Sequence, residues 1–190
     1  MPGILVNGVV AVKFATPMQV ISNQPVFAMD TVSLKRLTNS QGAQRWEIKT
    51  ALEPSNHGYD FFVHSVMNGY NTVFDIRMPQ VYRGEGIYTT GSFSASGAAG
   101  SSVVSYSGGA IPKGEFVRFS SHNKVYMVTA DASGGNLSIF PKLKTAASGA
   151  MEVGDGVNFK ATYDQSSILG MTYQNGILGD PGTVTFIEAF

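Results

Sequence analysis

The segment from Ile111 to Leu143 constrains the fold most, because it reads as three short strands in succession. Two turn-forming sequences, Ser-Ser-His-Asn and Asp-Ala-Ser-Gly-Gly-Asn, separate three stretches rich in β-branched and aromatic residues: Phe116–Phe119, Lys124–Thr129 and Leu137–Phe140. The segment therefore predicts a β-meander. It carries no set of groups that performs chemistry, so its value lies in its shape and its strand edges. This pattern indicates an architectural or binding protein.

The balance of charges limits the partners of the chain. Its 190 residues allow one domain, or one domain with a smaller insertion. Lys plus Arg and Asp plus Glu number 13 each, so there is no excess positive charge to attract phosphate, and we expect no nucleic-acid partner. Charged residues are only 14% of a chain with 22 glycines, which favours a turn-rich β protein partly covered by neighbours. The absence of cysteine excludes disulfides and thiolate chemistry.

The first residues predict a β-hairpin rather than a targeting segment. Asn7 and Gly8 stand between the apolar runs 4–6 and 9–12, which is the signature of a two-residue hairpin turn. No basic region precedes them, and no apolar run in the chain approaches the ~18 residues that span a bilayer. We expect a soluble protein with no export signal and no membrane insertion.

Further strands are predicted along both halves of the chain, at Val9–Phe14, Val26–Arg36, Arg45–Leu52, Val73–Met78, Val157–Thr162 and Thr183–Ile187. In the third of these, apolar and charged residues alternate with the period of a strand that has two unlike faces. Its Trp46, the only tryptophan, is either a core anchor or a platform on which a ligand stacks. The position of Trp46 in the middle of an alternating strand favours the core.

One amphipathic helix is predicted at about residues 56–69. A break at residues 53–56 supplies possible N-caps, and Gly69 ends the segment. Between them, apolar residues recur at three- and four-residue spacing: Tyr59, Phe62, Val63, Val66 and Met67. A single helix of this kind in a β protein is expected to lie across a sheet and cover its apolar face.

Residues 91–110 are almost entirely small and mark a boundary in the chain. They are either a flexible linker or a weak strand between Gly/Ser turns, and the presence of Val103, Val104 and Tyr106 favours the strand. The expected fold class is mainly β. It comprises a β-sandwich core domain of residues 1–82 plus 146–190 with the one amphipathic helix, and an inserted small β-barrel-like module of residues 83–145.

No arrangement of side chains in the sequence supports catalysis, a cofactor or a metal ion. His57 and His64 lack a third ligand at helical spacing, and His122 lies in a turn where a polar residue is expected. Neither a Gly-x-Ser-x-Gly nucleophile turn nor a phosphate-binding loop occurs. Residues 131–136 hold a single carboxylate, too few for calcium, and read as a hairpin turn. We therefore expect no catalytic, cofactor-binding or metal-binding residues, and a protein that is not an enzyme.

Four aromatic residues surround the small-residue segment: Tyr82, Tyr88, Phe93 and Tyr106. They could line a surface that contacts a sugar or a partner, because aromatic faces stack on the apolar faces of sugars. The other interpretation, which we favour, is that these rings pack inside a small β module.

Four groups of segments carry a resemblance to a known family: Gln44–Glu47 with Leu52–Pro54; Phe62–Gly69 with Phe74–Pro79; Glu115–Val117 with Lys124–Val128 and Leu137–Leu143; and Phe186–Glu188. Together they cover most of the chain and resemble the distal tail proteins, a class of tail-tip or baseplate proteins of tailed bacteriophages. The resemblance implies a β-sandwich with one helix and an inserted β-barrel-like module.

The resemblance also implies a function. A protein of this class is a structural component of the virion tail, assembled in the cytoplasm of the bacterial host. It forms a ring, here expected to be a hexamer or a trimer, that joins the tail tube to the host-recognition apparatus. The expected partners are further copies of the chain and other tail proteins such as tube and hub.

Two other functions remain open from the sequence. One is a carbohydrate-binding module without catalytic activity, based on the aromatic residues between positions 82 and 106. The other is a small hydrolase whose cleft forms only in the fold.

Overall fold

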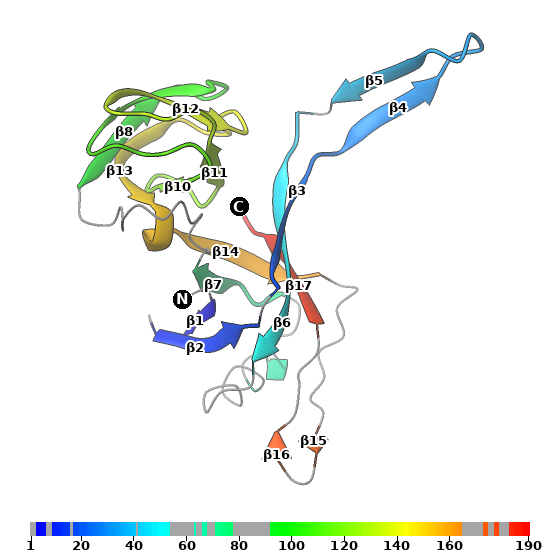
Figure 1. The fold of residues 1–190 in the computed structure, drawn as a ribbon, viewed down its shortest axis with the longest axis vertical. Helices are drawn as coiled ribbons and strands as arrows, with labels where there is room; N and C mark the ends of the chain where they lie inside the picture. The colour runs from blue at the N-terminus through cyan, green and yellow to red at the C-terminus, as the bar shows by residue number, and fades with distance from the viewer. Residues whose placement is uncertain are drawn as a thin grey trace.

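The structure, a computed structural model, describes residues 3–6, 9–15, 17–40, 42–53, 63, 66–67, 71–77, 92–164, 173–174, 177–178 and 183–190. These residues are mainly β-strands, arranged as two closed barrels and two separate two-stranded sheets, one of which projects from the barrels as a long hairpin (Figure 1). In chain order the strands are β1 (Gly3–Val6), β2 (Val9–Phe14), β3 (Gln19–Asn23), β4 (Val26–Asp30), β5 (Arg36–Ser40), β6 (Arg45–Glu53), β7 (Phe74–Arg77), β8 (Phe93–Gly97), β9 (Val103–Ser107), β10 (Phe116–Phe119), β11 (Val125–Val128), β12 (Gly135–Phe140), β13 (Ala147–Val153), β14 (Asn158–Tyr163), β15 (Tyr173–Gln174), β16 (Ile177–Leu178) and β17 (Thr183–Glu188).

The first barrel is a sheet with the order β17-β14-β7-β1-β2-β6, in which β6 pairs back onto β17. The predicted hairpin at its start is confirmed, because Val6 pairs with Val9 across the turn. The predicted β-sandwich is not confirmed. Strand β6 is nine residues long, so it pairs with β2 and β3 along one edge and with β17 along the other. This double pairing closes the sheet into a barrel instead of leaving two facing layers.

The second barrel lies between β7 and β14 in the chain and has the strand order β10-β11-β12-β9-β8-β13. The three strands predicted between residues 116 and 140 are confirmed as β10, β11 and β12. The strands of this barrel run from Phe93 to Val153, whereas the insertion predicted from the sequence spans residues 83–145. The later end arises because β13 pairs with both β8 and β10 of this barrel, although its Ser148-Gly149-Ala150 sequence gives no hydrophobic alternation.

Small residues give the second barrel its close packing. The predicted weak strand around Val104 and Tyr106 is confirmed as β9, and β8 precedes it within the same small-residue stretch. A Cβ atom added at Gly97 in β8 would lie 2.7 Å from a methyl carbon of Val104 and 2.9 Å from one of Leu143. Composition alone suggested a linker here, but a narrow barrel needs small residues where its strands approach its core side chains.

The β4–β5 hairpin, residues 26–40, was not predicted from the sequence, and we call it the arm. One strand was predicted over Val26–Arg36, but the chain reverses between Asp30 and Arg36, and Leu34 there has a φ of 60°. The arm continues the ladder of β3 and β6 and extends away from both barrels (Figure 1). Reversal at this point places residues 26–40 outside the body of the protein.

The predicted helix at residues 56–69 lies almost wholly outside the described residues, and a single amphipathic helix is not confirmed. The described residues of this segment, Val63, Val66 and Met67, have helical backbone and are exposed. A one-turn 3-10 helix, Gly154–Gly156, links the second barrel to β14. Within the described residues, no helix has the length and apolar character needed to cross a membrane.

The two barrels share one hydrophobic cluster at their contact. Phe116 and Val125 of the second barrel pack in the core of the first. Trp46 of β6 is 4% exposed, donates its indole N–H to the carbonyl of Val125 at 2.9 Å, and meets the ring of Phe116 edge-on at a centroid distance of 5.4 Å. The prediction of Trp46 as a core anchor is therefore confirmed, and this side chain joins the barrels.

We expect Trp46→Ala to lower the free energy of unfolding by about 3–5 kcal/mol, because it removes a large buried ring and leaves the Val125 carbonyl without its donor. Trp46→Phe, which keeps most of the apolar volume, should cost less. Urea denaturation followed by circular dichroism measures both. An alanine variant as stable as the wild type would contradict the anchoring role.

Candidate functional site

The contact between the barrels is built around one buried carboxylate. Glu188 ends β17, and its side chain forms an ion pair with the ammonium group of Lys124; the two side chains are 0% and 3% exposed. The same carboxylate accepts hydrogen bonds from the backbone N–H of Trp46 at 3.1 Å and of Val125 at 2.9 Å. One side chain of the first barrel thus holds the start of β6 and the start of β11 together.

Burial shifts both members of this ion pair towards their neutral forms. Removal from water is the main cause that raises the pKa of Glu188, and the charge of Lys124 opposes the shift. Removal from water likewise lowers the pKa of Lys124, against the attraction of Glu188. Each charge is therefore held in place by its partner, and loss of one leaves the other buried without compensation.

A polar chain extends from the ion pair to the base of the arm. Lys124 donates to the side-chain oxygen of Gln44 at 2.7 Å, and the Gln44 amide donates to the hydroxyl of Ser22 at 3.1 Å. Beside it, Asn23 donates to Glu47 at 2.7 Å. Because Ser22 and Asn23 lie just before the arm and Gln44 just after it, the arm leaves the body from a hydrogen-bonded base.

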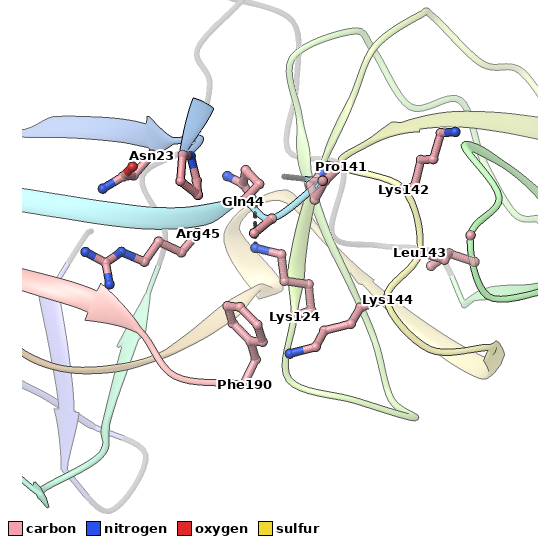
Figure 2. A pocket seen from close by; sticks show the side chains of 13 residues that line it. Asn23, Gln44, Arg45, Lys124, Pro141, Lys142, Leu143, Lys144 and Phe190 are labelled. Atoms are coloured by element: carbon pink, nitrogen blue, oxygen red, sulfur yellow. Dashed lines mark hydrogen bonds between the residues drawn. The ribbon is translucent and has the colours of Figure 1, made fainter. Parts of the chain in front are cut away.

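A pocket of about 810 Å³ opens beside this junction (Figure 2). One wall comes from the base of the arm, including Pro25 and Arg45, and the other from the second-barrel segment 141–144. Phe190 lies between the walls, and the ammonium groups of Lys144 and Lys124 lie 3.8 Å and 4.7 Å from the centre of its ring. The pocket combines cations with apolar surface, which suits a ligand that has an acidic group and an apolar part.

The four aromatic residues singled out in the sequence do not form a described surface. Tyr82 and Tyr88 lie outside the described residues. Phe93 and Tyr106 belong to the core of the second barrel, where both are buried. The hydroxyl of Tyr106 accepts the backbone N–H of Gly134 at 2.5 Å, which fixes the ring inside the barrel. Neither of these two rings presents a face to solvent on which a sugar could stack.

Other polar side chains that bear on chemistry have structural contacts where they are described. Asp131 of the suspected calcium loop accepts the backbone N–H of Lys113 at 2.7 Å. Glu152 accepts two hydrogen bonds from Arg118, at 2.7 and 2.8 Å. Among the described residues no group of three or more His, Cys, Asp or Glu side chains could hold a metal ion. His57 and His64 lie outside the described residues.

His122 forms a hydrogen-bonded chain that reaches the pocket wall. The hydroxyl of Tyr126 accepts the backbone N–H of Lys144 at 3.1 Å, which leaves its proton to bond the Nε2 atom of His122 at 2.9 Å. The Nδ1 atom of His122 lies 3.1 Å from the hydroxyl of Ser121. Burial lowers the pKa of His122 and so favours the neutral imidazole, which can accept the proton of Tyr126 at Nε2.

Sequence reasoning missed Glu188, Lys124 and Gln44, although one signal was present. In β17 the inward positions are Val184, Phe186 and Glu188, so the period-2 pattern places a carboxylate on the core face. A charge on that face must find a partner. The identity of that partner depends on the packing of the second barrel, which periodicity does not reveal.

Comparison with known proteins gives no match for this chain, either among models of protein families or among curated proteins.

We expect Glu188→Ala to lower the free energy of unfolding by about 3–5 kcal/mol, because Lys124 would remain buried without its counter-charge. The double variant Lys124→Met with Glu188→Gln removes both charges and should recover part of that loss. Lys160→Ala breaks a partly exposed ion pair with Asp75 and serves as the matched control, with an expected loss below about 1 kcal/mol. Equal losses in Glu188→Ala and the control, measured by urea denaturation, would contradict the role of the buried pair.

A second expectation concerns pH. Burial lowers the pKa of His122 below its ordinary 6.5, so the unfolded chain takes up this proton more readily than the folded one. Its contribution to stability is present above 6.5 and is lost as the pH falls below that value. Between about pH 7.5 and about pH 5.5, the melting temperature of the wild type should fall more than that of His122→Gln. Identical pH profiles for the two proteins would contradict the neutral imidazole.

Proposed function

We propose that this chain is a structural subunit of the tail tip or baseplate of a tailed bacteriophage. In this role it forms a ring that joins the tail tube to the host-recognition apparatus, as the sequence resemblance implies. The observation that carries the proposal is the arm, a hairpin that projects from a two-barrel body (Figure 1). Its exposed side chains form an apolar face.

The apolar face of the arm follows from the register of its strands. Met29 pairs with Leu37, and Phe27 lies two residues before Met29 on the same side. The exposed fractions of Phe27, Met29 and Leu37 are 62%, 54% and 48%. The opposite face holds Ala28 beside Thr38 and is more polar. Large apolar side chains gathered on one face of a hairpin are normally buried, but here they meet solvent.

Physical reasoning favours a partner that covers this face. A two-stranded hairpin alone is marginally stable in water, and the arm forms a two-stranded sheet separate from both barrels. Burial of a side chain such as Phe27 or Leu37 contributes about 1.5–3 kcal/mol. A closed ring repeats one contact between two different patches of the subunit, and an arm that reaches a neighbouring copy provides one of the two.

The body of the protein supports the same proposal. The ion pair of Glu188 and Lys124 and the ring of Trp46 fix one barrel against the other. A ring needs subunits whose two contact patches keep a constant relative angle. The carbohydrate-binding alternative depends on Tyr82 and Tyr88, which are not described, and on two rings in the core of the second barrel, so we do not propose it.

We expect the purified wild type to form a ring of defined copy number. Replacement of the arm's apolar face, with Phe27→Ser, Met29→Ser and Leu37→Ser combined, should leave a monomer with an unchanged circular dichroism spectrum, because these side chains are exposed in the monomer. The matched control is Ala28→Ser with Thr38→Ser on the opposite face, which should still assemble. Light scattering after size exclusion and negative-stain electron microscopy measure the outcome.

A wild type that stays monomeric at every concentration and does not join particles containing tail-tube protein would contradict the proposal. A triple variant that assembles as well as the wild type would show that the arm is not the contact.

A further inference from the structure

We propose that the pocket at the base of the arm binds an acidic peptide segment of a partner protein. The carboxylates of the segment would lie near Lys142 and Lys144, and its apolar side chains against Phe190 and Pro141 (Figure 2). This site is separate from the apolar face of the arm, so the inference stands or falls independently of ring formation.

The side chains that line the pocket are positively charged. Arg45, Lys124, Lys142 and Lys144 line the pocket, and no Asp or Glu does. Two of these cations are compensated within the protein, because Arg45 lies 3.0 Å from Glu47 and Lys124 is paired with Glu188. Within the described part of the chain, neither Lys142 nor Lys144 lies within ion-pair distance of a carboxylate. The side chains of the wall therefore carry an excess of positive charge.

Two positive charges, those of Lys124 and Lys144, lie close together at the pocket. The ammonium groups of Lys124 and Lys144 lie against the same ring of Phe190, and Glu188 beside them is a single carboxylate. Burial is the main cause that lowers the pKa of Lys124, and the charge of Lys144 lowers it further. An incoming anion near Lys144 would offset this repulsion in a site that is partly shielded from water.

The shape and apolar surface of the pocket decide the class of anion. A volume of about 810 Å³ is far larger than a single inorganic ion needs and accommodates several side chains. Pro25, Pro141 and Phe190 supply apolar surface, which a phosphate group or a sugar-phosphate backbone would leave uncovered. The chain has zero net charge and therefore lacks the extended positive field that nucleic acids require. A peptide with alternating acidic and apolar residues matches both features.

The arm of a second copy of this chain is a poorer occupant of the pocket than an acidic peptide. Residues 26–40 contain Lys35 and Arg36 but one carboxylate, Asp30, so the arm is itself positive. Like charges at a contact are unfavourable. The occupant is therefore expected to be a different protein.

The test uses a capped synthetic peptide of alternating glutamate and leucine, six residues long, and a matched peptide with lysine in place of glutamate. Binding is followed by the backbone amide signals of Lys142, Leu143 and Lys144 in two-dimensional NMR spectra. We use the monomeric variant with the serine-substituted arm, so that failure of ring assembly does not affect the readout. The acidic peptide should shift these signals, with an affinity that falls as salt is added.

The double variant Lys142→Gln with Lys144→Gln should bind the acidic peptide about fivefold or more weakly, because it removes two exposed charge contacts. Lys113→Gln removes an exposed lysine of the second barrel outside the pocket and should bind as the parent does. Equal binding of the acidic and basic peptides, no shift at the pocket, or unchanged affinity in the double variant would overturn the inference. Displacement of the peptide by tripolyphosphate at equal concentration would reassign the pocket to a phosphate ligand and overturn it too.

Discussion

The arrangement of the two barrels depends on the buried carboxylate of Glu188. It bonds a lysine side chain and two backbone N–H groups that belong to different barrels, so neither barrel can rotate without leaving a buried charge or donor unsatisfied. A buried ion pair adds little net stability compared with apolar packing, because desolvation offsets the attraction of the charges. Its effect here is geometric: among the ways in which two small barrels can pack, it favours the one that satisfies every group of the network.

This constraint reaches the arm through Gln44. The side chain of Gln44 connects Lys124 with Ser22, so the residues on both sides of the arm's base are tied to the barrel contact. A hairpin on a free linker would sample many directions, and its ordering on binding would cost conformational entropy. A hairpin on a fixed base loses less entropy when its apolar face is covered. The hydrogen bonds at the base of the arm thus lower the entropic cost of covering its apolar face, although no side chain takes part in both.

The sequence predicted those parts of the fold in which one strand carries its own pattern. Strands β6, β10 and β11 have apolar alternation or aromatic runs, and the turn at Asn7 and Gly8 has a local signature. It did not predict features that depend on distant partners: the closure of the first barrel by pairing of β6 with β17, and the bond between Trp46 and Glu188 across 142 positions. Strands β8 and β13 were missed because small side chains give no periodic signal, and the pocket because its walls come from segments that lie far apart in the sequence.

The pocket at the base of the arm and the apolar face of the arm differ in chemistry. This difference would let one subunit bind two unlike neighbours. The arm offers apolar side chains with a weak positive charge, whereas the pocket offers excess cations around an aromatic ring. A partner complementary to one is poorly matched to the other, since an acidic peptide finds few cations on the apolar face of the arm and an apolar ribbon leaves the pocket's lysines unpaired. Under the proposed function, the same subunit can therefore hold a copy of itself and a different tail protein at once. Neither partner would then compete for the other's site, so the two contacts could form in either order.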